Sequence, residues 1–378
     1  MAKVSLKNVT KIYPSKKGRE VTAVNDLDLE IEDHEFVVLT GPPNCGISSI
    51  IRMIAGLDDI SKGDIFIGDQ RVNDLPPKDR DIALVPQDYM PYPRLSVHDS
   101  LAFGLKLRKF PAAELKKRVL GAAAVLGLQD LLEHRPHSLS REQRQRVAIA
   151  RAVALQPKVF LFDEPLANLE TKARGQMRNE IAKLHQRLQT TTIYATHDPV
   201  EAMALGGRIV VVSDGALQQD GTARLLYDEP ANVFVAGFVG AAPMNFVRGS
   251  LKQERDWLLF AEAEEGTIEV RLPVSQFPAG EKFAGKAVLL GIRPEEIRIV
   301  DSTATQKYGD NFPALTDLVE VTGAATNLYL QTGAHTLICR VPSEVNALEA
   351  GHRARFSLNL NKLCFFDPVS TCRITQVS

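Results

Sequence analysis

Two glycines separated by four residues lie in the segment Gly41–Ser49, between an apolar run and a helix-like segment. A helix N-terminus presents unpaired N–H groups and a partial positive charge, so an anion binds there, and glycine lets the backbone approach it closely. Gly41, Gly46 and Ser48 fit the phosphate-loop pattern, but Ile47 occupies the position of its lysine. Taken alone, the segment is equally compatible with an ordinary strand, turn and helix.

Four polar side chains come directly after predicted apolar strands: Gln87, Asp163, Glu164 and His197. Because ligands bind at the carboxyl ends of strands in a parallel sheet, we expect these groups to converge near the phosphate loop. An aspartate in this position can hold the Mg²⁺ of a nucleotide, and the next carboxylate can polarise an attacking water. His197 can hydrogen-bond the γ-phosphate and that water. Each residue alone has a simple structural explanation, but their order along the chain favours a nucleotide site.

The elements that must position these groups alternate between strands and helices. Apolar patterns predict strands or hairpins at 3–9, 21–31, 65–69, 82–85, 159–162, 191–195 and 208–219. Apolar residues at helical spacing occur at Ile50, Ile54 and Leu57, at 115–126 and at 177–188. Ser140 is a predicted N-cap of a further long helix. The uninterrupted apolar run 159–162 is typical of a parallel strand buried on both faces, so we expect an α/β fold.

The pattern changes after about residue 240, where long helical repeats disappear. Short apolar alternations follow at 268–272, 287–292, 297–300, 326–330 and 337–341, with glycine and proline between them. This indicates a small β-barrel or sandwich domain, with the boundary near Gly240 to Pro243.

Composition places the chain among soluble globular proteins. Its 378 residues suggest about two or three domains of roughly 150 residues each. The net charge of −1 gives no basic footprint for nucleic acid. Four scattered cysteines are expected to be reduced packing residues: Cys45, Cys339, Cys364 and Cys372. No signal core or run of about 18 apolar residues occurs, so any membrane role is expected to need a partner.

On these motifs, the sequence resembles the ATP-binding subunit of an ABC transporter, in the maltose-type group of carbohydrate and glycerol-phosphate importers. The matching motifs are the phosphate loop at 41–49, the Q-loop at Gln87, the signature at 139–143, Walker B at 162–165, the D-loop at 167–170 and the switch histidine at 196–198. The segments 144–152, 237–246 and 291–295 also resemble the family. The resemblance implies a P-loop NTPase cassette at 1–240, with a mixed sheet core and a helical subdomain at about 89–155. An OB-like regulatory and dimerisation barrel at 241–378 follows it.

The resemblance also implies roles for single residues. ATP would be bound by Tyr13, which stacks on adenine, and by Gly41, Pro42, Asn44, Cys45, Gly46, Ile47, Ser48 and Ser49, with Ser140 and Gln143 of the signature contacting the ATP of the opposite subunit. Mg²⁺ would be held by Ser48, Gln87 and Asp163, and catalysis would fall to Glu164, His197 and Gln87.

Several positions depart from the family pattern. Ile47 replaces the lysine that contacts the β- and γ-phosphates, and Asn44 replaces a glycine but tolerates left-handed geometry. Arg141 and Glu142 replace the two signature glycines, so we expect crowding there and repulsion of phosphate by Glu142. Arg141, reaching across a dimer, would restore some positive charge. The D-loop departs from the family at Ala167 and Glu170.

Three functions remain open at this point. The first is an ATP-hydrolysing importer subunit that couples ATP to uptake of a carbohydrate or glycerol-phosphate-type solute. The second is a weakly hydrolysing or non-hydrolysing structural or regulatory subunit paired with a competent one, and the third is an ATPase outside transport. For the first two we expect membrane permease subunits as partners, homodimer or heterodimer formation, no nucleic acid, and a cytoplasmic location on the inner face of the cell membrane. We also expect the segment Tyr89–Leu101 to contact the permease.

Overall fold

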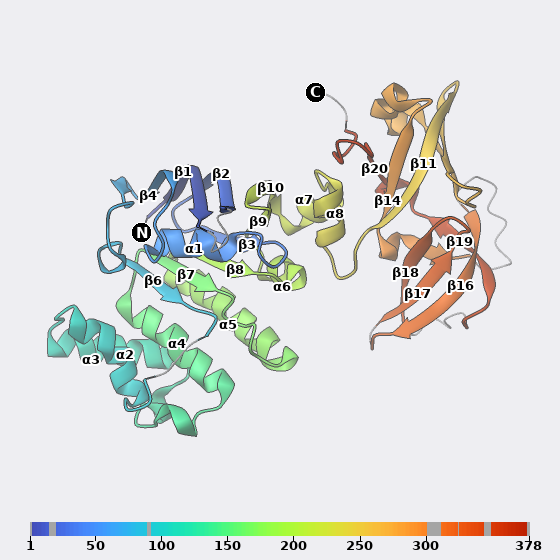
Figure 1. The fold of residues 1–378 in the computed structure, drawn as a ribbon. Coiled ribbons are helices and arrows are strands. Elements are labelled where there is room, and N and C mark those ends of the chain that lie inside the picture. The colour runs from blue at the N-terminus through green and yellow to red at the C-terminus, as the bar shows by residue number, and fades with distance from the viewer. Residues whose placement is uncertain are drawn as a thin grey trace. The chain divides into compact units, whose positions relative to one another are not determined.

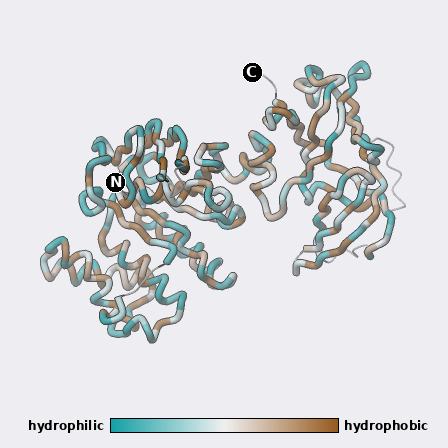
Figure 2. The backbone as a smooth tube through the Cα atoms, viewed as in Figure 1, coloured by the Kyte–Doolittle hydropathy of each residue, from teal (hydrophilic) through white to brown (hydrophobic). Residues whose placement is uncertain are grey.

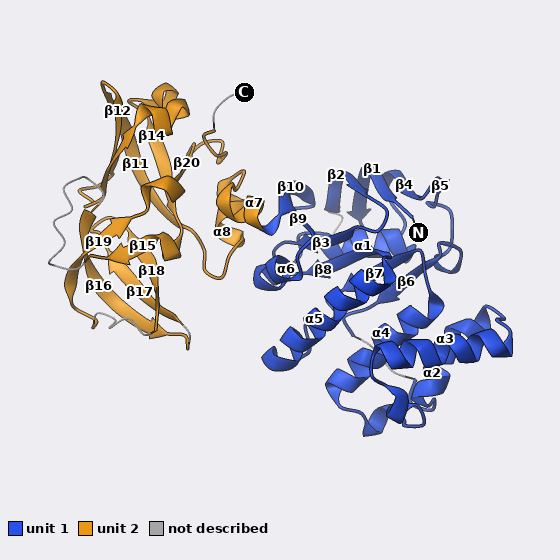
Figure 3. Cartoon of the chain, turned by 180° about the vertical axis from the view of Figure 1, so that it is seen from behind, with its two compact units in different colours: residues 1–223 blue, residues 224–378 orange. Residues whose placement is uncertain are grey.

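The chain forms two compact units, Met1–Ala223 and Arg224–Ser378, which Figure 3 shows in separate colours. The computed structural model describes residues 2–14, 20–88, 92–300, 311–323, 325–343 and 349–375. The boundary expected after residue 240 falls inside the second unit. Figure 2 shows hydrophobic segments in both units, in keeping with a separate core in each.

The described strands of the first unit form one mixed and one antiparallel sheet (Figure 1). The mixed sheet has the order β10-β9-β3-β8-β7-β6, and its strands are β3 (Phe36–Thr40), β6 (Ile82–Val85), β7 (Val159–Asp163), β8 (Thr191–Thr196), β9 (Arg208–Ser213) and β10 (Ala216–Thr222). The antiparallel sheet has the order β2-β1-β4-β5, with β1 (Val4–Tyr13), β2 (Val21–Ile31), β4 (Lys62–Ile67) and β5 (Gln70–Arg71). Because β3, β6, β7 and β8 run parallel, their carboxyl ends meet at one edge, as the sequence predicted.

Helices cover this sheet and form a separate group beside it. The helices are α1 (Ile47–Ala55), α2 (Val97–Leu107), α3 (Ala112–Val125), α4 (Arg141–Leu155), α5 (Thr171–Leu188) and α6 (Pro199–Leu205). Figure 1 shows α2, α3 and α4 together, and α2 and α3 both pack on α4, which confirms a mostly helical region before residue 155. None of the helices within the described ranges is long and apolar enough to cross a membrane.

Two helix ends show how local sequence sets these elements. α1 ends at Gly56, whose φ of 72° is left-handed, so Leu57 lies outside the helix and is 47% exposed. The prediction that Leu57 belongs to its apolar face is therefore wrong. Ser140 caps α4 as predicted, because its Oγ accepts from the Gln143 N–H while the Gln143 side chain accepts from the Ser140 N–H.

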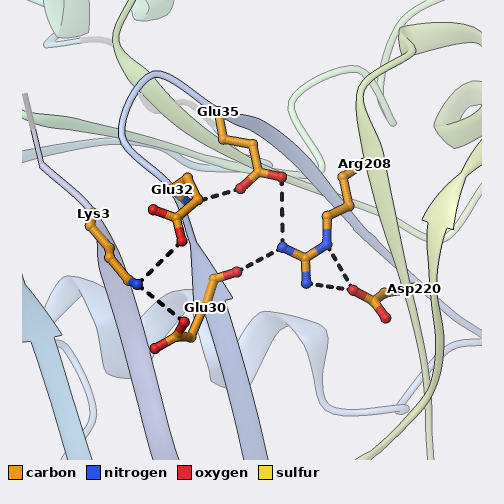
Figure 4. A network of polar contacts seen from close by, with 6 residues as sticks. All are labelled: Lys3, Glu30, Glu32, Glu35, Arg208 and Asp220. Atoms are coloured by element: carbon orange, nitrogen blue, oxygen red, sulfur yellow. Dashed lines mark hydrogen bonds and ion pairs between the residues drawn. The ribbon is translucent and has the colours of Figure 1, made fainter.

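A network of polar side chains connects the two sheets of the first unit. Figure 4 shows its members: Lys3, Glu30, Glu32, Glu35, Arg208 and Asp220. Arg208 on β9 donates from Nε to Asp220 at 2.7 Å and from Nη1 to the Glu30 carbonyl on β2 at 2.8 Å. Because exposed ion pairs contribute only about 0–1 kcal/mol, this network adds little to the stability of the unit.

In the described part of the second unit the strands form two five-stranded antiparallel sheets. Their orders are β13-β12-β11-β14-β20 and β15-β19-β16-β17-β18. The strands are β11 (Asn245–Glu254), β12 (Trp257–Glu262), β13 (Glu269–Pro273), β14 (Ala287–Ile292), β15 (Ile297–Ile299), β16 (Asn311–Val321), β17 (Ala325–Gln331), β18 (Thr336–Pro342), β19 (Arg353–Leu358) and β20 (Cys364–Phe366). The apolar inner faces of both sheets share one core, as a barrel-like domain requires.

Helices α7 (Ala223–Asp228) and α8 (Val233–Phe238) are attached to this barrel by apolar packing, by backbone hydrogen bonds and by a buried arginine. Arg293 is 3% exposed and donates to the carbonyl oxygens of Ala236, Val239 and Tyr227 at 2.9, 2.5 and 2.9 Å. Burial lowers the pKa of Arg293 and raises the pKa of Tyr227 to about 12. These contacts place α7 and α8 in the second unit.

Candidate functional site

The turn between β3 and α1 has the close packing that a phosphate loop needs. A Cβ on Gly41 would lie 2.0 Å from the Val212 carbonyl oxygen. Gly46 has a φ of 105°, and a Cβ there would lie 2.2 Å from the Ala23 carbonyl oxygen, so only glycine fits at either position. Asn44 has a φ of 67°, which confirms the left-handed geometry expected of it.

The N-terminus of α1 is available to an anion. No side chain caps it, because its N-cap is Gly46, whose carbonyl accepts from the Ile50 N–H at 3.0 Å. The preceding turn is closed by Cys45, whose N–H donates to the Pro42 carbonyl at 3.1 Å. The uncapped N–H groups and the helix dipole therefore point at the place where a phosphate would bind.

Ile47, the first residue of α1, has an exposed fraction of 0% and belongs to the hydrophobic core of the first unit. The position that carries a phosphate-binding lysine in the loop pattern is therefore an apolar packing position here. Next to it, Cys45 is also buried, and burial raises the pKa of its thiol. The loop thus keeps its backbone shape while it lacks a cationic side chain.

Asp163, the last residue of β7, faces the hydroxyl of Ser48 on α1. Burial raises the pKa of Asp163, and the nearby Ser48 side chain partly offsets this rise. Its Oδ1 is buried and has no hydrogen-bond partner among the described residues. A buried unpaired carboxylate oxygen beside a hydroxyl matches the oxygen ligands that Mg²⁺ prefers, so these two residues fit a magnesium site.

The His197 ring joins the second carboxylate to the phosphate loop. Its Nδ1 lies 2.8 Å from the Gly41 carbonyl oxygen, which can only accept, so Nδ1 donates. Its Nε2 lies 3.3 Å from Oε1 of Glu164. Glu164 is held in turn by its N–H, which donates to the Ala195 carbonyl at 3.0 Å. The predicted convergence of Gly41, Glu164 and His197 is therefore confirmed.

Tyr13 lies beside the phosphate-loop helix at the end of β1. Its hydroxyl contacts Asp58 at 2.7 Å and Ser49 at 3.3 Å, and Lys11 lies 4.6 Å from the ring centroid. Arg52 also binds Asp58, which lowers the pKa of that carboxyl. Sequence reasoning missed Asp58 as the anchor of Tyr13, because nothing in the spacing links residues 45 positions apart.

Gln87 lies apart from the predicted magnesium ligands. It is exposed, and its carbonyl oxygen is 3.5 Å from the side-chain amide of Asn168 in the D-loop. It lines an open groove of about 480 Å³ together with Asp88, Arg141, Arg144, Gln145, Pro165, Asn168 and Leu169. No contact joins Gln87 to Ser48 or Asp163 in the part of the chain described here. A larger cavity of about 710 Å³, between α3, α4 and α5, contains none of the predicted site residues.

The signature residues form a helix start whose acidic group is paired. Ser140 and Gln143 bind each other in the capping box described above. Glu142 lies 3.0 Å from Arg146, which also lies 2.6 Å from Glu180 on α5. The carboxylate expected to repel phosphate is therefore ion-paired within the chain, with an arginine that it shares with Glu180.

Comparisons with known proteins agree with this geometry. Residues 24–167 match the ABC transporter family, 240–297 the MalK OB fold domain and 290–366 the TOBE domain. The oligosaccharides import ATP-binding protein MsmX of Bacillus subtilis is 43% identical to this chain, and the alignment covers 99% of this chain and 100% of MsmX. The chain belongs to the ABC transporter ATP-binding proteins, in their maltose-type group.

Two further proteins are similar to the whole chain and to its first unit, respectively. An uncharacterized ATP-binding protein of Escherichia coli, YcjV, is 43% identical over 97% of this chain and 98% of its own. A dimeric ATP-binding cassette in a post-hydrolysis state, bound to ADP and Pi, superposes with a TM-score of 0.52 at 30% identity. The superposition covers 58% of this chain and 98% of that cassette. The cassette fold and the barrel that follows it, both expected from the sequence, are thus confirmed.

Proposed function

We propose that this chain is the ATP-binding subunit of an importer that takes up a carbohydrate or glycerol-phosphate-type solute. The printed function of MsmX, oligosaccharide import, and the MalK OB fold match support this class of solute. The observation that carries the proposal is the convergence of Asp163, Glu164 and His197 on the phosphate loop. A sheet edge with a magnesium site, a general base and an anion-binding helix start suits nucleotide hydrolysis.

Each residue of the site has a task in this mechanism. Tyr13 stacks on the adenine, and the backbone of residues 41–49 binds the phosphates. Ser48 and Asp163 would hold Mg²⁺, with Gln87 joining from its own loop, and the ion would neutralise phosphate charge. Glu164 orients the attacking water and accepts its proton. His197 keeps the Glu164 carboxylate next to the loop, because its other nitrogen is fixed on Gly41.

Two copies, or this chain and a related one, would pair so that each phosphate loop meets the signature of the other. The barrel at the C-terminus would strengthen this dimer, and membrane permease subunits would bind it at the cytoplasmic face. The segment Tyr89–Leu101 is our proposed permease contact, although residues 89–91 lie outside the described part. Within the rest, Tyr92 is 36% exposed and packs 4.8 Å from Phe103. A cross-linker at position 92 should capture a permease, and capture of none would contradict the contact.

A weakly hydrolysing or non-hydrolysing subunit is a second candidate, because Ile47 replaces the lysine with a buried apolar side chain. The deciding experiment copurifies the chain with its permease, counts the ATP-binding subunits, and measures Mg²⁺-dependent ATP turnover. Glu164→Gln should abolish turnover and leave binding of a fluorescent ATP analogue intact. If the parent shows no turnover in a complex that contains a second ATP-binding protein, the second candidate holds. If it binds no nucleotide in any complex, both proposals are wrong.

A further inference from the structure

The cavity of about 710 Å³ in the first unit has no part in the nucleotide site described above. It lies between helices α3 and α4 on one side and the start of β7 and the end of α5 on the other. Small-molecule sites in proteins usually have volumes of about 300–1,000 Å³, so this cavity has the size of a ligand site.

The walls of this cavity are largely apolar. Five apolar side chains line it: Ala122 and Val125 from α3, Val153 from α4, Phe160 from β7 and Leu188 from α5. Two of them, Val125 and Leu188, are only half-buried, so they present apolar surface to the solvent in the cavity. Removing such surface from water is favourable, and an apolar body bound between these helices would do so.

The charged side chains of the cavity are mostly cationic, and two of them have no partner. Lys117 and Lys158 line the cavity and are exposed, and neither ammonium group makes an ion pair or hydrogen bond with any residue in the described ranges. Arg118 is occupied, because its Nε donates to Glu114 at 2.6 Å and its Nη1 to the Leu155 carbonyl at 3.3 Å. The cavity lining described here contains no other carboxylate than Glu114, so it keeps an excess of positive charge.

We propose that this cavity binds a small anionic amphiphile, which is a molecule with a carboxylate, sulfonate or phosphate group on an apolar body. The apolar body lies between α3, α4 and α5, and the anionic group pairs with Lys117 and Lys158. The lysine stems extend the apolar wall while their ammonium groups stay in water. A bound molecule touches the helices and β7 at once, so it stabilises the packing of these elements on each other. This inference goes beyond the proposed function and does not depend on it.

Two glycines allow a test that leaves the fold intact. Gly121 lies inside α3 and lines the cavity, and a Cβ there would meet no atom from another part of the described structure within 4 Å. Gly175 inside α5 has equally open surroundings but does not line the cavity. Glycine is a poor helix former, so glutamine or glutamate at either position should preserve or raise the stability of the helix.

The test titrates the full chain with anilinonaphthalene sulfonate, an apolar anion whose fluorescence rises on binding. The parent should bind it saturably. Gly121→Glu should weaken binding about tenfold or more, because the new carboxylate repels the sulfonate and pairs with Lys117 one turn away. Gly121→Gln, which adds the same bulk without charge, should retain most of the affinity, and Gly175→Glu should bind like the parent.

The lysines provide a second, independent set of variants. Lys117→Gln and Lys158→Gln should each weaken binding of the dye about threefold, because each removes one charge that attracts the sulfonate. Lys116→Gln is the matched control, since Lys116 is an exposed neighbour on α3 that does not line the cavity, and it should have no effect. Added salt should weaken binding to the parent and leave Lys117→Gln less affected.

Competing molecules identify the chemistry of the ligand and its source. Octanoate should displace the dye, whereas octanol, which lacks the charge, and acetate, which lacks the apolar chain, should not do so at the same concentration. Vesicles of phosphatidylglycerol present an anionic group on apolar chains from a membrane. Displacement by octanoate supports the proposal with a free small molecule as the ligand, and displacement by the vesicles alone supports it with a lipid as the ligand.

Three results would overturn the inference. The first is a parent that does not bind the dye, and the second is equal binding by the parent, Gly121→Glu and both lysine variants. The third is equal displacement by octanol and octanoate, because the site then does not recognise charge. Urea unfolding of Gly121→Glu should show at least the stability of the parent, and a loss of stability would attribute weak binding to misfolding and count against the inference. None of these measurements involves ATP, so each leaves the proposed function standing.

Discussion

Replacing Ile47 by lysine tests the central departure from the phosphate-loop pattern. A lysine there would pair with phosphate oxygens in a water-poor site, and a buried charged contact of this kind is worth about 2–5 kcal/mol. At about 1.4 kcal/mol per factor of ten, this corresponds to roughly thirty-fold to several-thousand-fold in affinity. Ile47→Lys should therefore tighten Mg²⁺-ATP binding by the monomer at least about tenfold.

The structure also predicts that Ile47→Lys lowers the stability of the protein when no nucleotide is bound. Because Ile47 is 0% exposed, its burial contributes about 1.5–3 kcal/mol. The lysine stem replaces much of this apolar contact, but its ammonium loses water, so we expect the unliganded variant to unfold about 1–3 kcal/mol more easily. Saturating Mg²⁺-ATP should reverse that loss, since a ligand that binds only the folded state stabilises it.

Titration of a fluorescent ATP analogue, with urea unfolding of the same samples, measures both effects. Ile47→Met is the matched control, because methionine has a similar unbranched stem without charge and should cost less than about 1.5 kcal/mol. Its ATP affinity should equal that of the parent. If the parent or Ile47→Met already binds as tightly as Ile47→Lys, another group supplies the charge in the monomer and the reasoning fails.

Three further predictions concern other groups. Burial raises the pKa of Asp163, so acidification should abolish Mg²⁺-dependent nucleotide binding at a higher pH than it would with an ordinary aspartate. Asp163→Asn should lose the Mg²⁺ dependence at every pH. A Mg²⁺ requirement retained by this variant would exclude Asp163 as a ligand. Burial lowers the pKa of His185, so the imidazole binds a proton more readily in the unfolded chain than in the folded one. The free energy of unfolding should therefore fall as the pH drops below about 6.5. Urea titrations should show a flatter pH dependence for His185→Gln, and an identical slope would contradict this. Residues 224–378 should fold alone. Residues 241–378 should be less stable by at least about 2 kcal/mol, because Arg293 then lacks its three carbonyl partners and the apolar packing of α8 is also lost; equal thermal stability of the two fragments would refute this.

The cassette fold was predictable because its strands carry their signals locally. The apolar run 159–162 and the β-branched run 191–195 both became central strands, and Ser140 became the N-cap of α4. Strands of the barrel were harder to recognise. β11 has Gly249 at an inward position, and β12 ends at Glu262, which is fully buried and accepts from Thr332 at 2.6 Å and from His335 at 2.6 Å. A buried acidic side chain breaks the alternation, and its partners lie about seventy residues away.

The residues of the site were predictable where their positions follow from local strand signals. Asp163, Glu164 and His197 follow strands whose parallel pairing brings them together, so position along the chain was sufficient. Pairings across long separations were not. Arg146, which pairs with Glu142 one turn away, is also held by Glu180 34 residues further on, and the orphan amide of Gln145 exists only in the folded groove. Sequence spacing therefore located the reactive groups but not the long-range partners of the signature helix.

The backbone of Glu164 has a further consequence for this protein. Its φ of 47° is left-handed, a conformation that costs a side-chain-bearing residue about 1–2 kcal/mol and glycine almost nothing. A Glu164→Gly chain should therefore resist heat better than the parent while it loses the carboxylate. Laboratory evolution for heat resistance alone would erase the proposed general base at this position, so a screen for more robust forms of this protein has to select for nucleotide turnover at the same time.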